Sequence, residues 1–391
     1  MSLPNNILLV LNGHKYVSYF FEPIAQIAHM QGIKVNLAIP DAGEFEEKNW
    51  PLATSVRKFK VMLCVTNPCA VLREIFQKAF IPIDTQLLHV VTTHMIFLCL
   101  LRLTIRREHF EGIFVMHFIG LGRALGGTGY LCWFIRTTLK GLWLVRPRRG
   151  IIYRCIFLND DDHRVLYSIF GDREVKYCKI PGAGVRKDRF DYHSIDLSHD
   201  FAQPYKLLFV GRLIEEKGIE KFVRLISEIN TRSAVRVIGE IVGGFETEIY
   251  QSKIQTLVRK LRLSDVLNFV GSVENPAPHF KNSHFLIFPS YYGEGVPTVL
   301  LESQYCGTPC LASDIAGCRE AIIDGVTSHI VATDRVDDWL SAFLQMIDAT
   351  NYAKMSESAH HWVSQNFDAI TLATSTIEWI CREFETEYEG K

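Results

Sequence analysis

Several features are scarce in this sequence, and each absence excludes a class of protein. No apolar run approaches the roughly 20 residues of a membrane-spanning helix; MIFLCLL is among the longest and ends at Arg102. The N-terminal MSLPNNILLVLNG lacks the basic stretch and cleavage site of a secretory signal. The ten cysteines form no CxxC pair, which favours reduced thiols, Cys306 and Cys310 among them, over a disulfide framework. We therefore expect a cytoplasmic protein.

Charge is nearly balanced overall but is unevenly distributed. The 391 residues carry a formal net charge of -1 and are 48% hydrophobic, which is typical of a globular chain of two domains. Residues 101–150 hold nine basic and two acidic residues, and the arginines alternate with Trp, Phe and Leu. This face, with Arg146, Arg148 and Arg149, predicts contact with an anionic membrane; an ordinary solvated surface is the alternative. No recognition motif for nucleic acid accompanies the charge.

Strand-like and helical segments alternate in both halves of the chain. NILLVLNG, a helical segment ending at Gly32 and IKVNLAIP read as one βαβ unit, and YKLLFVGRL (205–213) restarts the rhythm. This alternation predicts two doubly wound α/β domains, 1–195 and 196–365, joined by a polar linker at 191–204. A C-terminal amphipathic helix, 366–391, is expected to pack back on the N-terminal domain. Ligands of such sheets bind beyond the carboxyl ends of strands, so a cleft between the domains is the expected site.

The turn GRLIEEKG after the strand KLLFV carries two cations. Gly211 permits a tight exit from the strand, Arg212 stands at its end, and Lys217 is predicted to begin a helix that Gly218 continues. A helix N-terminus adds unpaired N–H groups and partial positive charge. The combination suits a diphosphate, although cations at a helix start are often merely solvated.

The segment YYGEGVPTVLLE places two carboxylates after the apolar run HFLIFPS. Glu294 lies in a glycine-flanked loop, and a helix is predicted from about Val296 with Pro297 in its first turn. Glu302 is then expected two turns along that helix, on a different face from the loop. Carboxylates spaced in this way can accept hydrogen bonds from a polyhydroxylated ligand at two separate places. In the simpler alternative, Glu294 caps the helix and Glu302 is a surface residue.

Together these segments resemble the retaining glycosyltransferases of family 4, which have the GT-B fold, and the resemblance covers nearly the whole chain. LLFVGRLIEEKGIEKFV, LNFVGSV and IFPSYYGEGVPTVLLESQYCGTPCLASDIAGCREAIIDG carry it in the donor-binding half. It implies a UDP-sugar donor, with Arg212 and Lys217 on the diphosphate, Glu294 on the transferred hexose or N-acetylhexosamine, and Glu302 on the ribose. The donor site would also include Gly211, Gly295, Val296, Pro297 and Thr298. It implies no cofactor and no metal.

The N-terminal half is similar to the subgroup that extends undecaprenyl-diphosphate-linked oligosaccharides of bacterial O-antigen, lipopolysaccharide or capsule. LHVVTTH (88–94), GLGRAL (120–125), YRCIFLNDDD (153–162) and IPGAGVRKDRF (180–190) carry this resemblance. It implies a lipid-linked saccharide acceptor, a place on the inner face of the cytoplasmic membrane, and an acceptor side at Gly120, Gly122 and Arg123. Many family members have a histidine where this chain has Ile119; His117 could substitute for it or be structural.

Other interpretations remain open. The NDDD run invites a metal site, but Asn159 and Asp162 are expected to be structural polar residues between the domains. A sugar-nucleotide 2-epimerase, a transferase acting on a soluble acceptor and a non-catalytic sugar-nucleotide binder are the functional alternatives. A nicotinamide dehydrogenase is disfavoured because VLNGHKYV lacks GxGxxG.

Overall fold

The chain folds into two compact units. The computed structural model describes residues 3–11, 21–40, 52–59, 81, 84–105, 110–127, 129–147, 150–193, 204–291 and 293–388. Unit 1 comprises Met1–Gly184, Gly293–Gly295 and Ala369–Lys391, and unit 2 comprises Val185–Tyr292 and Val296–Asp368. Each unit is described below by itself.

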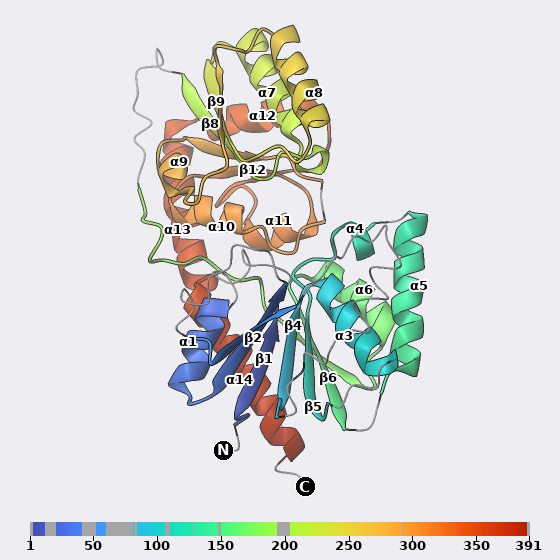
Figure 1. The fold of residues 1–391 in the computed structure, drawn as a ribbon. Coiled ribbons are helices and arrows are strands. Elements are labelled where there is room, and N and C mark those ends of the chain that lie inside the picture. The colour runs from blue at the N-terminus through green and yellow to red at the C-terminus, as the bar shows by residue number, and fades with distance from the viewer. Residues whose placement is uncertain are drawn as a thin grey trace. The chain divides into compact units, whose positions relative to one another are not determined.

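Unit 1 is built on a parallel sheet in the order β3-β2-β1-β4-β5-β6-β7 (Figure 1). The strands are β1 (Asn6–Val10), β2 (Lys34–Pro40), β3 (Ser55–Phe59), β4 (Leu87–Val91), β5 (Gly112–His117), β6 (Ile151–Phe157) and β7 (Val175–Lys179). Both faces of the central strands are buried, which explains their continuous apolar runs. The order reverses between β1 and β4, where parallel sheets of this kind have their ligand crevice.

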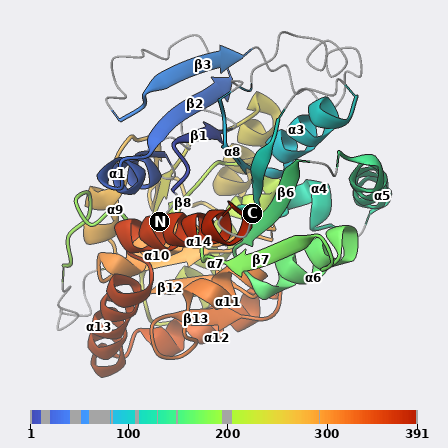
Figure 2. The same ribbon diagram turned by 90° about the horizontal axis from the view of Figure 1, so that it is seen from below.

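Helices cover both faces of this sheet. The helices of unit 1 are α1 (Glu22–Met30), α3 (Thr93–Ile105), α4 (Gly122–Leu125), α5 (Tyr130–Val145), α6 (Asp160–Phe170) and α14 (Ala369–Tyr388). Side chains of β1 alternate between two apolar clusters: Leu8 packs with residues of α3, α5 and α6, and Leu9 with residues of α1 and α14. The view in Figure 2 shows α14 lying beneath the sheet.

A buried ion-pair network fastens α14 to the sheet of unit 1. Arg154 of β6 is buried, and its Nε donates to Glu383 at 2.6 Å while its Nη2 donates to Glu387 at 2.8 Å. Lys176 of β7 lies 3.0 Å from Glu383 as well. The last helix therefore completes both the apolar core and the charge pairing of the unit that the N-terminus begins.

Unit 2 repeats the architecture with a parallel sheet in the order β10-β9-β8-β11-β12-β13. The strands are β8 (Tyr205–Val210), β9 (Val237–Val242), β10 (Leu267–Gly271), β11 (Phe285–Phe288), β12 (Cys310–Ser313) and β13 (His329–Val331). The helices are η3 (Glu215–Lys217), α7 (Ile219–Arg232), α8 (Glu248–Lys260), α9 (Ala277–Lys281), α10 (Thr298–Tyr305), α11 (Ala316–Ala321), α12 (Val336–Met346) and α13 (Ala349–Asn366). Its order reverses between β8 and β11. The two doubly wound α/β sheets expected from the sequence are confirmed.

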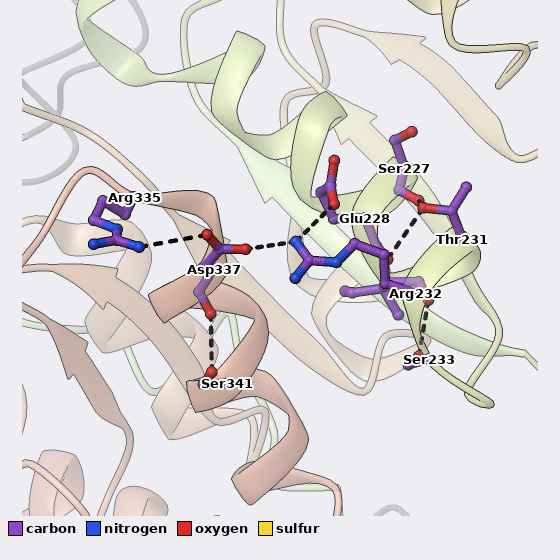
Figure 3. Close-up of polar contacts among 9 residues, drawn as sticks. Ser227, Glu228, Thr231, Arg232, Ser233, Arg335, Asp337 and Ser341 are labelled. Carbon is purple, nitrogen blue, oxygen red and sulfur yellow. Dashed lines mark hydrogen bonds and ion pairs between the residues drawn. The ribbon is translucent and has the colours of Figure 1, made fainter.

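A surface network joins two neighbouring helices of unit 2 (Figure 3). Arg232, in the last turn of α7, lies 3.1 Å from Glu228 and 2.5 Å from Asp337 in the first turn of α12. Arg335 lies 3.6 Å from Asp337 on the other side. The hydrogen bond from Arg232 lowers the pKa of Asp337. These contacts fix the end of α7 beside the start of α12, on the side of the sheet away from the loops considered below.

The boundary between the two units lies between Gly184 and Val185, which is earlier in the chain than the linker predicted at 191–204. Phe190 packs on Phe280 with ring centroids 6.3 Å apart, and the N–H of His193 donates to the Cys306 carbonyl at 3.0 Å. Lys281 pairs with Asp191 at 2.8 Å. The start of that polar stretch is therefore part of unit 2, and residues 194–203 lie outside the described residues.

Two features of the described residues concern the cysteines and the length of the apolar helices. Cys306 and Cys310 are buried in unit 2, and burial raises the pKa of each thiol to about 12. Where the chain is described, no helix combines the length and apolar content that crossing a bilayer requires.

Candidate active site

The cationic turn of unit 2 follows β8, at the point where the strand order reverses. The N–H of Gly211 donates to the Val242 carbonyl at 3.0 Å, and the N–H of Leu213 donates to Gly244 at 2.9 Å. These bonds hold the turn against the loop after β9, which contains Glu246. The Arg212 side chain is 59% exposed, and its Nη1 lies 3.7 Å from Glu246 Oε1. The guanidinium is therefore accessible, with an acidic neighbour that the sequence analysis did not single out.

Lys217 ends a short helix rather than beginning a long one. It is the last residue of the single-turn η3, and Gly218, in the left-handed region at φ 76°, then caps α7, which starts at Ile219. The prediction that Lys217 begins a helix continued by Gly218 was therefore wrong by two residues. Gly218 is required here because a Cβ atom would lie 2.2 Å from the Pro289 carbonyl oxygen. The turn and the loop after β11 thus touch directly.

Further bonds tie the Lys217 turn to the loop after β11. The N–H of Tyr291 donates to the Glu216 carbonyl at 2.9 Å, and Ser290 Oγ donates to the same oxygen at 3.2 Å. Lys217 Nζ lies 5.5 Å from the centroid of the Phe288 ring, a cation–π distance. The ends of the adjacent strands β8 and β11 therefore bring two cations beside the segment that leads to Glu294.

The helix after this loop begins later than predicted. Pro297 is the N-cap residue, at φ -68° and ψ 114°, and α10 starts at Thr298, so neither Val296 nor Pro297 lies in its first turn. The capping position is therefore held by Pro297 and not by Glu294. Val296 is buried, which fixes the approach of the chain to the helix N-terminus.

Glu302 is a buried carboxylate. It lies in α10, about one turn after Thr298, and only 4% of it is exposed. The alternative that Glu302 is a surface residue is therefore wrong. Burial raises the pKa of the neighbouring Cys306, and the charge of Glu302 raises it further. Glutamate is rarely this buried in proteins, and this one lies in a short helix that follows β11, beside the switch point.

The tripeptide Gly293–Gly295, which carries Glu294, belongs to unit 1. The N–H of Gly122 donates to the Gly293 carbonyl at 3.1 Å. A Cβ atom on Gly120, where φ is 116°, would lie 2.5 Å from the Gly295 nitrogen. Gly120 is thus needed for close backbone approach to this tripeptide, and Gly122 contacts it through its backbone N–H. Arg123 follows them in α4.

His117 is a core residue of unit 1. It ends β5, is 1% exposed, and its Nδ1 lies 3.1 Å from Nε2 of His89 on β4, with the two rings stacked 5.3 Å apart. Burial lowers the pKa of His117 well below its usual value, with the neighbouring His89 as a second cause, and lowers the pKa of His89 to about 3. Two neutral stacked imidazoles fit the structural interpretation better than an acceptor contact.

The NDDD run forms a helix cap. Asn159 is the N-cap of α6, and its Oδ1 accepts the N–H of Asp162 at 2.8 Å. Its Nδ2 donates to Asp162 Oδ2 at 3.1 Å and to the Gly295 carbonyl at 3.3 Å. Burial is the main cause that raises the pKa of Asp162 to about 7. Within the described ranges, no three His, Cys, Asp or Glu side chains gather as metal ligands would.

The arginines of the basic stretch are not all on the surface. Arg146 is buried, stacks on the Trp143 ring with its guanidinium carbon 3.2 Å from the centroid, and pairs with Glu174. Arg102 is buried too. The prediction that Arg146 belongs to a membrane-facing basic patch was therefore wrong, and Arg148 and Arg149 lie outside the described residues.

The second half of the chain is similar to one known protein family. Residues 197–362 match the family described as Glycosyl transferases group 1. D-inositol 3-phosphate glycosyltransferase 2 of Catenulispora acidiphila is 29% identical over 240 residues, 57% of this chain and 55% of that protein. The chain spans about half the length of the curated relatives it matches.

Solved structures resemble the whole fold. HepE of Anabaena, solved in complex with UDP and glucose, has a TM-score of 0.72 at 16% identity, covering 96% of this chain and 99% of that chain. Sucrose-phosphate synthase of Thermosynechococcus elongatus has a TM-score of 0.75 at 16% identity, covering 98% and 100%. At this identity the likeness shows the fold, two Rossmann-like domains of the GT-B type.

Proposed function

We propose that this chain, whose residues 197–362 match the group 1 glycosyl transferases, is a retaining glycosyltransferase that uses a UDP-sugar. It would move a hexose or N-acetylhexosamine to a polyprenyl-diphosphate-linked saccharide in the assembly of bacterial O-antigen, lipopolysaccharide or capsule, at the inner face of the cytoplasmic membrane. The observation that carries the proposal is the pair of cations, Arg212 and Lys217, held at the switch point of unit 2 beside the loop after β11.

The donor diphosphate would bind at this cationic turn. The exposed guanidinium of Arg212 and the ammonium of Lys217 supply charge-assisted hydrogen bonds to phosphate oxygens. As the bond to the sugar breaks, negative charge grows on the diphosphate, and the two cations stabilise it without a metal ion. The N-terminus of α10 at Thr298, with the adjoining backbone of Gly295, Val296 and Pro297, lies along the same chain segment and would face the donor.

The two glutamates would hold the ends of the donor. Glu302, buried in α10, would accept hydrogen bonds from the ribose hydroxyls, a use that explains why its carboxylate is kept out of water. Glu294, which lies between two glycines and belongs with them to unit 1, would orient the sugar. A donor phosphate oxygen would take the acceptor proton, so the proposal names no side-chain base. UDP and glucose in the HepE complex support UDP as the nucleotide.

A transferase acting on a soluble acceptor is the second candidate. It is favoured by the similarity to a relative named D-inositol 3-phosphate glycosyltransferase 2. A sugar-nucleotide 2-epimerase of the same fold would differ from both, because it converts its UDP-sugar with no acceptor present.

A panel of UDP-sugars tested with polyprenyl-diphosphate saccharides, with soluble acceptors and with no acceptor separates these candidates by product mass. Arg212→Ala should lower kcat/KM by at least about 100-fold, because one charged transition-state contact is lost. Arg224→Ala is the matched control: this exposed arginine of α7 pairs with Glu220 at 2.8 Å, and its loss should leave transfer unchanged. Full transfer by Arg212→Ala would overturn the assignment of the site.

A further inference from the structure

Helix α5 of unit 1 exposes an apolar and aromatic face. Its most exposed large side chains are Tyr130 at 78%, Trp133 at 57%, Phe134 at 52%, Leu144 at 62% and Val145 at 68%. With 3.6 residues per turn, positions 130, 133, 134, 144 and 145 fall on one side of the helix. The Tyr130 and Trp133 rings contact each other in a tilted arrangement with their centroids 5.6 Å apart. The aromatic rings gather near the start of α5, and the aliphatic pair lies at its end.

The opposite side of α5 is already used by the core of unit 1. Cys132, Leu139, Leu142 and Trp143 are buried, and the helix packs against α3, α4 and α6. Trp143 Nε1 donates to the Phe170 carbonyl at 3.0 Å. The outer side of α5 therefore has exposed apolar side chains at both ends, with the exposed Thr137, Thr138 and Lys140 between them; Figure 1 shows the helix on the outside of the helices that cover this face. A helix with apolar side chains on the side away from its own core presents them to a further neighbour.

The charged residues of α5 itself indicate which neighbour that is. The helix carries Arg136 and Lys140 and no Asp or Glu. Lys140 is exposed, whereas the guanidinium of Arg136 donates hydrogen bonds to the carbonyls of Leu125 and Gly127. Exposed Tyr and Trp rings at one end of the helix, exposed aliphatic side chains at the other, an exposed Lys between them and no Asp or Glu within the helix are typical of a helix lying in the lipid interface.

We propose that the outer face of α5 inserts into the interfacial layer of a lipid bilayer and anchors the chain there. This names the partner surface for the function proposed above and rests on that function for its purpose, but lipid binding is measured without donor or acceptor. Because Arg146 is buried, apolar insertion supplies most of the binding, and Lys140 adds attraction to anionic lipid. Binding should therefore persist at high salt, unlike that of a purely basic patch.

Flotation of the full chain with vesicles tests this proposal. Vesicles of phosphatidylcholine alone and of phosphatidylcholine mixed with phosphatidylglycerol are compared at low and high salt. The wild-type chain should float with both, more strongly with the mixture. The double variant Trp133→Glu/Phe134→Glu should partition at least about tenfold less, because two apolar side chains are lost from the interface. Both positions are exposed, so the melting curve should not change.

Ile249→Glu is the matched control. Ile249 is an 86% exposed apolar residue of α8 in unit 2, and this variant should float as the wild type does. Flotation of the double variant at the wild-type level overturns the proposal, as does a wild-type chain that binds only the anionic mixture and only at low salt. A wild-type dimer that the double variant converts to a monomer, with no flotation by either, would assign α5 to a subunit interface instead. Loss of flotation with UDP binding retained separates a failure at α5 from a failure at the donor site.

Discussion

Replacing Asp162 with Asn should remove a pH dependence from the stability of unit 1. Burial raises the pKa of this carboxyl from 3.8 to about 7 in the folded chain. Between those values the folded state binds a proton that the unfolded state has released, so the free energy of unfolding falls as pH rises. A shift of about three units corresponds to about 4 kcal/mol, lost between about pH 4 and pH 7 and constant above.

Asn is isosteric with the protonated acid, and its carbonyl can still accept the hydrogen bond from Asn159. The Asp162→Asn variant should therefore match the wild type near pH 4 and exceed its free energy of unfolding by about 4 kcal/mol at pH 7 and above. Native-state hydrogen exchange of amides in β6 and α6, followed across this pH range, measures the difference. Asp160→Asn is the control, because that side chain is 69% exposed in the same helical turn. A parallel pH dependence in wild type and Asp162→Asn would refute the argument.

Two further predictions concern the donor loops of unit 2. Gly218→Ala should destabilise the chain by at least about 2 kcal/mol, because it combines a left-handed backbone with a Cβ contact to the Pro289 carbonyl; an unchanged melting temperature would contradict this. Glu246→Gln should tighten UDP binding about two- to threefold at low salt and have no effect at high salt, because the exposed carboxylate competes with the diphosphate for Arg212; calorimetric titration that shows no salt-dependent difference would contradict it.

The fold could be predicted from the sequence because its signals are local. Apolar runs such as KLLFV and FLIF became buried strands, and parallel topology then placed their carboxyl ends at one edge of the sheet. The turn with Arg212 and Lys217 was found in this way. Its helical details were not, because the left-handed Gly218 is set by contact with Pro289, which is far away in the sequence.

The errors about charge have a common cause. Arg146 was expected at the surface because it lies in the basic stretch, but it is buried and pairs with Glu174. Arg154, just beyond that stretch, is likewise buried and pairs with Glu383 of α14. Such pairing depends on tertiary structure. Composition alone therefore predicted a basic surface patch over residues 101–150, although not all of the arginines there lie on the surface. The burial of Glu302 also depends on tertiary structure. The sequence of α10 has no strong apolar stripe that would show which of its faces is buried.

The role of α14 in unit 1 has a consequence for how this chain is made. The strands of unit 1 are translated before unit 2, yet Ile377, Ile380 and Phe384, which close one side of their core, are translated only after it. Unit 2 can mature in between. A polypeptide released before Ala369 would leave a bare apolar strip and the guanidinium of Arg154 without its carboxylates, so late nonsense mutations should yield aggregated protein although every donor-site residue is present.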